Sequence, residues 1–243
     1  MLPSDEFSGV ICPCCGGHFA AFVPCGLAGR PNARCPRCGA RARHRLIWLY
    51  LAAETDLLRE RLTVLHFAPE RSLARSLASL QNLHYVSADL GHTPAKVRMD
   101  IGRIACLDSC VDIVLCSDVL EHVVEDERAM RELARILSPR GLAIVHVPVD
   151  TTREHTFEDW NIVTPEARLA HFGDPDHVRV YGRDFEARLE RAGFAVTPVP
   201  YARLLGSEAR RRYGLTERHG LWACRRKEGP PGGRHALSRS AIA

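Results

Sequence analysis

The sequence predicts an α/β fold, in which a mostly parallel sheet has helices on both faces. Apolar runs of strand length alternate with segments of helical periodicity from about residue 62 to residue 224, and 46% of the 243 residues are hydrophobic, enough for a real core. The most informative run is Val111–Cys116, which stops abruptly at Ser117-Asp118. A buried strand that ends at a carboxylate and turns into a helix is how open α/β sheets build a ligand crevice. An enzyme is therefore the leading interpretation.

The individual elements follow from local patterns. Strands are expected at the short apolar runs, which are Thr63–Ala68, Leu83–Asp89, Val97–Asp100, Val111–Cys116, Leu142–Val147, Phe194–Pro198 and Leu221–Cys224. Helices are expected from Leu46 onward, after Pro69-Glu70, through Met130–Leu137 up to a stop at Pro139-Arg140-Gly141, and over Arg183–Ala192. We expect the last two strands to form an antiparallel closing pair.

Two cysteine knuckles predict a zinc site near the N-terminus. Each is a Cys-x-x-Cys turn followed by glycine, and their cysteines are Cys12, Cys15, Cys35 and Cys38. Such a turn offers two thiolates, and glycine allows the backbone N–H groups to point at sulfur. Four thiolates leave no open position, so we expect a structural, zinc-ribbon-like module. Cys14 and Cys25 could compete as ligands, and the sequence leaves their role open.

Composition and charge suggest three parts. We expect a zinc-binding module over 1–45, an α/β domain over 46–226 and a disordered tail over 227–243. Residues 1–45 and residues 225–243 each carry a net charge of +4, so contact with nucleic acid is one option. Charge runs such as Arg41–Arg45, however, usually face water. No apolar run has membrane-spanning length and the N-terminus lacks signal-peptide features, so a cytoplasmic protein is expected. The oligomeric state cannot be read from the sequence.

The residues around the first turn of the α/β domain constrain its cofactor. Asp89 ends the second strand and lies 19 residues after Glu70, a position suited to hydrogen bonding with ribose hydroxyls. The first turn, His66–Ser72, contains no glycine, which argues against the close pyrophosphate approach of NAD or FAD. A cofactor with ribose and adenine but no phosphate fits better, and S-adenosylmethionine is the obvious candidate.

Residues 62–224 resemble class I S-adenosylmethionine-dependent methyltransferases, in particular the methyltransferase type 11 group. The resemblance rests on Asp112–His122, which is similar to the family's fourth-strand motif, and on Leu137–Val147, which is similar to its turn before the fifth strand with Arg140 in place of the first glycine. It implies a Rossmann-like three-layer α/β/α methyltransferase sheet.

The resemblance also implies roles for individual residues. Asp89 would hold the ribose hydroxyls, Asp100 and Ile101 would flank adenine, and Asp118 would face the methionine part or the acceptor. Residues His66–Glu70 occupy the place of the family's glycine-rich loop, where His66, Ala68 and Glu70 depart from its pattern. Glu70 could instead bind the cofactor's ammonium group. The pair Glu121-His122 is expected to stabilise the helix start.

The expected activity is methyl transfer to an unidentified acceptor, whose attacking atom cannot be read from the sequence. The insert Val149–Gly182 is rich in histidine and aromatic residues and should supply acceptor contacts, because such loops carry function in this architecture. His177 is the first candidate for a general base, followed by His155, with Asp118 as a wall of the site. A small-molecule acceptor is favoured. The alternatives are an RNA methyltransferase that uses the zinc module for binding, or a zinc-bearing scaffold without catalysis.

Overall fold

The structure is a computed structural model of the chain, and it describes residues 9–26, 29–91, 93–218 and 220–227. The chain forms two compact units. The sheet unit takes in residues 62–69, 84–198 and 222–243, and the cysteine unit takes in residues 1–61, 70–83 and 199–221. The predicted boundaries at residues 45 and 226 stay predictions. Apart from Lys227, the predicted tail lies outside the described residues.

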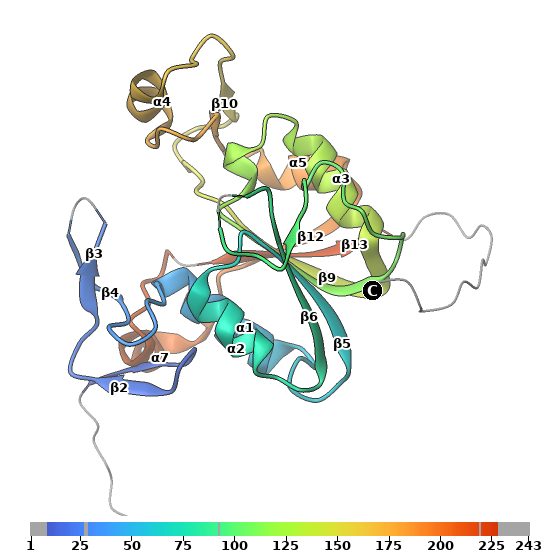
Figure 1. Cartoon of the computed structure of the whole chain (residues 1–243). Helices are drawn as coiled ribbons and strands as arrows, with labels where there is room; N and C mark the ends of the chain where they lie inside the picture. The colour runs from blue at the N-terminus through green and yellow to red at the C-terminus, as the bar shows by residue number, and fades with distance from the viewer. Residues whose placement is uncertain (1–8, 27–28, 92, 219, 228–243) are drawn as a thin grey trace, which may run out of the picture. The chain divides into compact units, whose positions relative to one another are not determined.

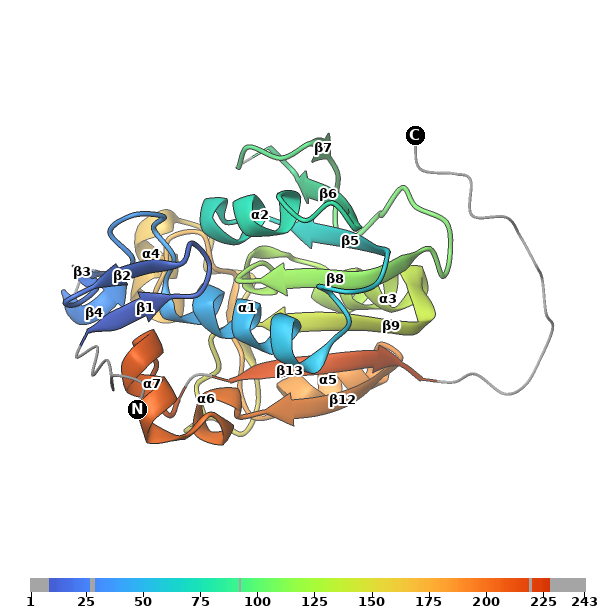
Figure 2. The same cartoon turned by 90° about the horizontal axis from the view of Figure 1, so that it is seen from below.

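A seven-stranded sheet forms the centre of the sheet unit. Its strands are β5 (Leu62–Phe67), β6 (Leu83–Asp89), β7 (Val97–Arg98), β8 (Val111–Ser117), β9 (Leu137–His146), β12 (Phe194–Val199) and β13 (Leu221–Arg226). Their order is β12-β13-β9-β8-β5-β6-β7, which Figure 2 shows from bottom to top. The pairs β5–β8, β8–β9 and β6–β7 are parallel, whereas β13 runs antiparallel to β9. The prediction of a mostly parallel sheet is confirmed, and the last two strands, β12 and β13, are neighbours in it.

Two helices of the sheet unit pack on this sheet. They are α3 (Asp126–Ile136) and α5 (Phe185–Arg191), which Figure 1 shows side by side. The buried stripe of α3, including Met130 and Leu133, joins one apolar cluster with α5 and strands β5, β8 and β9. The cluster follows from the spacing of three and four residues that puts apolar side chains on one helix face.

The connection between α3 and β9 differs from the prediction. The sequence suggested a helix stopped by Pro139-Arg140-Gly141, but α3 ends at Ile136 and β9 begins at Leu137. The register with β8 shifts between residues 137 and 142, so residues 138–141 bulge within the strand. Gly141 permits the bulge, because a Cβ atom there would lie 2.9 Å from the Ser138 carbonyl oxygen.

The insert between β9 and α5 has its own small framework. Strands β10 (Phe157–Glu158) and β11 (Arg179–Val180) pair antiparallel, and α4 (Pro165–Phe172) lies between them along the chain (Figure 1). The Thr164 side chain caps the start of α4, and Gly173 ends it in a left-handed conformation.

A buried arginine fixes the insert to the loop that follows β8. Arg179 is 1% exposed and forms an ion pair with Glu158 at 2.6 Å. Its guanidinium also donates to the carbonyl oxygens of Leu120 and Val124 at 2.8 and 2.9 Å. Asp126 lies 3.7 Å from the same guanidinium. These bonds satisfy a charge that would otherwise be costly to bury, so the insert and the β8 loop form one framework.

The cysteine unit contains short hairpins and helices. Its elements are β1 (Val10–Cys12), β2 (Gly17–Phe19), β3 (Val23–Cys25), β4 (Arg30–Arg34), α1 (Ala42–Glu54), α2 (Arg71–Ala78), α6 (Tyr201–Leu204) and α7 (Gly206–Tyr213). Strands β1 and β2, and likewise β3 and β4, pair antiparallel. No helix in the described part of the chain is long and apolar enough to cross a membrane.

Arg45 holds the cysteine unit together and corrects the prediction that the Arg41–Arg45 cluster is solvated. Its side chain is fully buried and donates to the carbonyl oxygens of Ala40 and Tyr213, both at 2.7 Å. The guanidinium also lies 4.0 Å from the centre of the Phe22 ring. The sequence pattern does not distinguish Arg45 from the other arginines of the cluster. Only the fold shows that Arg45 is the one buried beside the cysteine knuckles.

Candidate functional site

A cavity of about 700 Å³ lies where β5, β6 and β8 end, entirely within the sheet unit. It is bordered by carboxylates and apolar side chains, among them Phe67, Ala68, Asp89, Leu90, Met99, Asp100, Ile101, Asp118, Val119 and His122. Its volume is in the range of small-molecule and cofactor sites. The sequence predicted a crevice at this edge of the sheet, and five of the predicted site residues border the cavity: Ala68, Asp89, Asp100, Ile101 and Asp118.

Two residues at the cavity have a backbone conformation that usually requires glycine. Ala68 follows β5 with φ 44°, and Asp118 follows β8 with φ 54°. A left-handed conformation costs a residue with a side chain about 1–2 kcal/mol, and such strain gathers at functional sites. The turn after β5 therefore adopts, without glycine, a bend that usually requires it. Because residue propensity disfavours this conformation, it could not be expected from the sequence.

Asp89 organises the loop that borders the cavity. Its carboxylate is 7% exposed and accepts hydrogen bonds from the backbone N–H groups of Gly91 and Thr93 at 2.6 and 3.0 Å. The Thr93 hydroxyl donates to its second oxygen at 2.9 Å. An aspartate that bonds to its own backbone two residues later is a common turn signal, so this anchoring could have been expected from Asp89-Leu-Gly91.

The next loop presents Asp100 and Ile101. Asp100 is exposed and accepts from the backbone N–H of Gly102 at 2.7 Å, which holds its carboxylate at the start of the loop. Ile101 is buried and offers an apolar wall beside it. The two side chains thus combine an acceptor for an amino group with a surface for an aromatic ring.

The side chains of His66 and Glu70 lie elsewhere. His66 is fully buried on β5, and its Nδ1 lies 3.0 Å from the Tyr85 hydroxyl. Glu70 pairs with His44 in the cysteine unit, with 3.2 Å between the carboxylate and Nε2. Neither residue borders the 700 Å³ cavity. The predicted turn His66–Glu70 therefore reaches the cavity through Phe67 and Ala68.

Asp118 is held by a partner that sequence reasoning missed. Its Oδ1 lies 2.9 Å from Nδ1 of His146, and its backbone N–H donates to the His146 carbonyl oxygen at 2.9 Å. Asp118 follows β8 and His146 ends β9, so pairing of the parallel strands brings them together. The two residues are 28 positions apart, and no local pattern indicates this contact.

One further histidine, His122, borders the cavity. Its ring centre lies 4.7 Å from that of His177, which does not itself border the cavity. Burial lowers the pKa of His177, and the neighbouring His122 lowers it further, while Asp174 and Asp118 counteract this only in part. His177 is therefore biased toward the neutral form. His155 lies on an exposed turn and does not border the cavity.

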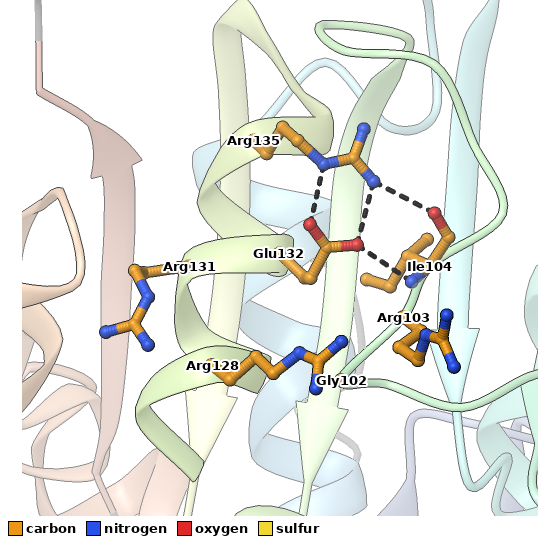
Figure 3. Close-up of a pocket in the computed structure, with 7 residues that line it drawn as sticks. All are labelled: Gly102, Arg103, Ile104, Arg128, Arg131, Glu132 and Arg135. Carbon is orange, nitrogen blue, oxygen red and sulfur yellow. Dashed lines mark hydrogen bonds and ion pairs between the residues drawn. The ribbon is translucent and has the colours of Figure 1, made fainter. Parts of the chain in front are cut away.

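A second cavity, of about 550 Å³, lies beside α3 and is lined mainly by arginines (Figure 3). It shares Gly102 and Arg128 with the first cavity. Two residues that line this cavity bind each other, since Arg135 forms an ion pair with Glu132 at 2.7 Å. This bond raises the pKa of Arg135. Glu132 also accepts from the backbone N–H of Ile104 at 2.8 Å. These bonds tie the loop after β7 to α3.

The four knuckle cysteines form a compact cluster in the cysteine unit. Their sulfur atoms lie within 4.8 Å of one another, with Cys12–Cys38 at 3.6 Å and Cys15–Cys35 at 3.8 Å. Four sulfurs around Zn²⁺ at about 2.3 Å would be separated by about 3.8 Å, so the spacing fits the ion. Cys14 is outside this group, and its Sγ lies 3.7 Å from the His44 carbonyl oxygen.

The four knuckle thiols differ in their surroundings. Burial acts to raise the pKa of Cys35, but the backbone N–H groups of Cys38 and Arg37 hold it below the ordinary value. Burial raises the pKa of Cys15 and Cys38, and a hydrogen bond with Cys14 raises that of Cys12. Gly16 and Gly39, which follow the second cysteine of each knuckle, have φ of 65° and 77°. Both values lie in the left-handed region, which glycine adopts without strain.

Comparisons with known proteins agree with this geometry. Residues 50–145 match the family model of a methyltransferase domain. No curated protein matches the sequence. Among solved structures, the YcgJ protein from Bacillus subtilis is 16% identical, with 76% of this chain and 98% of that chain covered and a TM-score of 0.50.

Two other solved structures are similar at lower scores. An S-adenosylmethionine-dependent methyltransferase from Mesorhizobium loti is 15% identical, with 75% and 98% of the two chains covered and a TM-score of 0.47. The 1,6-didemethyltoxoflavin-N1-methyltransferase of Burkholderia thailandensis is 15% identical, with 77% and 79% covered and a TM-score of 0.47. The match over residues 50–145 and the mostly parallel seven-stranded sheet agree with the Rossmann-like methyltransferase fold.

Proposed function

We propose that this chain is an S-adenosylmethionine-dependent methyltransferase with a small-molecule acceptor. The observation that carries the proposal is the 700 Å³ cavity, where Asp89, Asp100 and Asp118 meet apolar walls at the ends of the strands. Carboxylates are suited to hydroxyl and amino groups, and apolar side chains are suited to adenine. A cofactor that carries hydroxyl groups, an amino group and adenine, but no phosphate, therefore matches the side chains of this cavity.

Each part of the cofactor has a proposed partner. The buried carboxylate of Asp89 would accept from ribose hydroxyls, while Asp100 and Ile101 would hold adenine. Ala68 and Asp118, the two strained residues, would border the methionine part. His66 and Glu70 would act by shaping the turn, since their side chains contact Tyr85 and His44.

The chain's contribution to the chemistry is mainly alignment. Bound S-adenosylmethionine supplies an electrophilic methyl group on a sulfonium, which is an excellent leaving group. The protein then has to orient the acceptor and exclude water. Asp118, held by His146, forms one wall for this purpose. An acceptor that keeps its proton needs a base, and we propose His177 for that role, because it is half-buried and packs against His122, which borders the cavity.

The acceptor is proposed to be a small molecule because the insert forms part of the cavity wall. Asp176 of the insert borders the cavity, and the insert is fixed to the β8 loop by Arg179. A cavity that is walled in part by such an ordered segment is suited to a compact acceptor. An RNA acceptor is the second option and would require the basic cysteine unit to contribute binding.

We also propose a structural zinc ion at Cys12, Cys15, Cys35 and Cys38. The sulfur spacing fits tetrahedral zinc, and four thiolates would occupy every coordination position. The cysteine unit would then depend on the ion for its folding, because short hairpins bury little apolar surface.

Binding and labelling experiments test the proposal. Calorimetry on the full, zinc-loaded chain should show one site for S-adenosylhomocysteine, and absence of binding would overturn the enzyme proposal. Incubation with methyl-tritiated S-adenosylmethionine and cell extract should place label in a low-mass filtrate. Label that is precipitable and sensitive to ribonuclease would instead establish the RNA alternative.

A further inference from the structure

A group of three potential metal ligands lies beside the proposed cofactor cavity. It consists of Glu121, His122 and His177, whose ligand atoms all lie within 4.8 Å of one another. We propose that this group, called here the His-His-Glu cluster, binds a divalent transition-metal ion that holds the acceptor. This inference deepens the proposed function and rests on it.

The ligand types match a known kind of metal site. Two imidazoles and one carboxylate bind Zn²⁺ or Fe²⁺ in sites that keep positions open for water or substrate. Ligand bonds of about 2.1 Å in a tetrahedral site would bring the three atoms to about 3.4 Å from one another. That change requires side-chain rotation, for which the exposed side chain of His122 has room and the half-buried side chain of His177 has less.

Backbone carbonyl groups orient both imidazoles. Nδ1 of His122 lies 3.2 Å from the carbonyl oxygen of Asp176, so this nitrogen can donate there and leave Nε2 for a metal. His177 forms a hydrogen bond with the backbone of Phe172. Histidine ligands in metal sites almost always donate their other N–H to such a partner, which fixes the ring and its tautomer.

Hydrogen bonds also hold together the two segments that carry the ligands. The backbone N–H of Val178 donates to the carbonyl oxygen of Glu121 at 2.9 Å. Arg179 donates to the carbonyl oxygen of Leu120 at 2.8 Å. The ligands therefore come from segments 55 residues apart that are fixed relative to each other, with Glu121 itself 2% exposed. Such preorganisation is what a metal site requires of its scaffold.

The position of the cluster suggests what the metal would do. His122 borders the same cavity as Asp118, so an open position on the ion would face the space left for the acceptor. A divalent cation lowers the pKa of a coordinated hydroxyl group, whose proton then leaves to solvent. The acceptor class would be a molecule with an acidic hydroxyl or a pair of adjacent oxygen atoms. In this arrangement His177 serves as a ligand, and the ion replaces the general base.

Cobalt binding tests the site without an activity assay. The full chain, with zinc on its cysteine cluster, would be titrated with Co²⁺ and followed by visible absorption and metal analysis. Cobalt binds such sites more weakly than zinc, so it should leave the thiolate site untouched. We expect one added Co²⁺ per chain with weak bands and no intense thiolate charge-transfer band. The variants Glu121→Gln and His177→Phe should each weaken this binding at least tenfold.

The controls separate this proposal from the enzyme proposal. His155→Ala removes a nearby exposed histidine outside the cluster and should bind Co²⁺ like the wild type. S-adenosylhomocysteine binding on the same samples reports whether each variant is folded. No added Co²⁺ in the wild type, or unchanged binding in His177→Phe, would overturn the metal site while leaving cofactor binding intact. Co²⁺ binding without S-adenosylhomocysteine binding would instead overturn the proposed function and, with it, the metal's role in holding the acceptor.

Discussion

Replacing Asp89 with asparagine should weaken the binding of S-adenosylhomocysteine by about 1.5–3 kcal/mol. The side chain is 7% exposed, so its carboxylate is largely removed from water where we expect it to accept from ribose hydroxyls. A hydrogen bond to a charged group contributes about 1.5–3 kcal/mol, and about 1.4 kcal/mol corresponds to a tenfold change in Kd. The expected increase in Kd is therefore about 10- to 150-fold.

Asparagine is chosen because it preserves the loop. Its side-chain oxygen can still accept from the N–H groups of Gly91 and Thr93, which now contact Oδ1 of Asp89. Thr93→Val makes the complementary change, because it removes the hydroxyl bond to Oδ2 but keeps the charge. That variant should lose less affinity, about 0.5–1.5 kcal/mol, as expected for one hydrogen bond.

Isothermal titration calorimetry on the zinc-loaded chain measures both variants. Asp108→Asn is the matched control, because it makes the same change in charge at an exposed residue that pairs with Arg135 outside the 700 Å³ cavity. It should bind S-adenosylhomocysteine like the wild type. An Asp89→Asn protein with a Kd within twofold of the wild type would refute the ribose assignment.

Three further predictions concern metal, stability and protonation. Joint replacement of Cys35 and Cys38 by serine should remove the one zinc that survives dialysis against a weak chelator, as measured by elemental analysis, because tetrahedral binding would lose half of its thiolates. Arg179→Met should lower the free energy of unfolding in urea by about 3 kcal/mol, because it leaves Asp126 buried with fewer partners. In metal-free protein, NMR of the His177 ring should give a midpoint below pH 6.5, because burial and His122 both disfavour the charged form.

Each of these has a matched comparison. Cys25→Ser lies outside the cysteine cluster and should keep its zinc, so equal loss would contradict the ligand set. Arg191→Met breaks an exposed pair with Glu127 and should cost less than about 1 kcal/mol, so a larger cost would challenge the argument from burial. His122→Ala should raise the midpoint of His177 toward its ordinary value, and an unchanged midpoint would remove His122 as a cause.

The strand pattern was predictable because burial on both faces leaves a continuous apolar run. Strand β6 has the predicted bounds, Leu83–Asp89, and β8 extends one residue beyond Val111–Cys116. The bulge at residues 138–141 was not predictable, because it depends on how β9 must pair with β8. Proline and glycine there indicated an interruption, and only strand pairing decided that it lies inside a strand.

The sequence alone determined the sheet, the two cysteine knuckles and the carboxylates at the strand ends, because each depends on spacing along the chain. Only the tertiary structure decided which side chains meet. It pairs Asp118 with His146, directs Glu70 to His44 and brings His177 beside His122. Contacts between residues far apart in the chain depend on strand register and buried partners such as Arg179, and no local pattern encodes them.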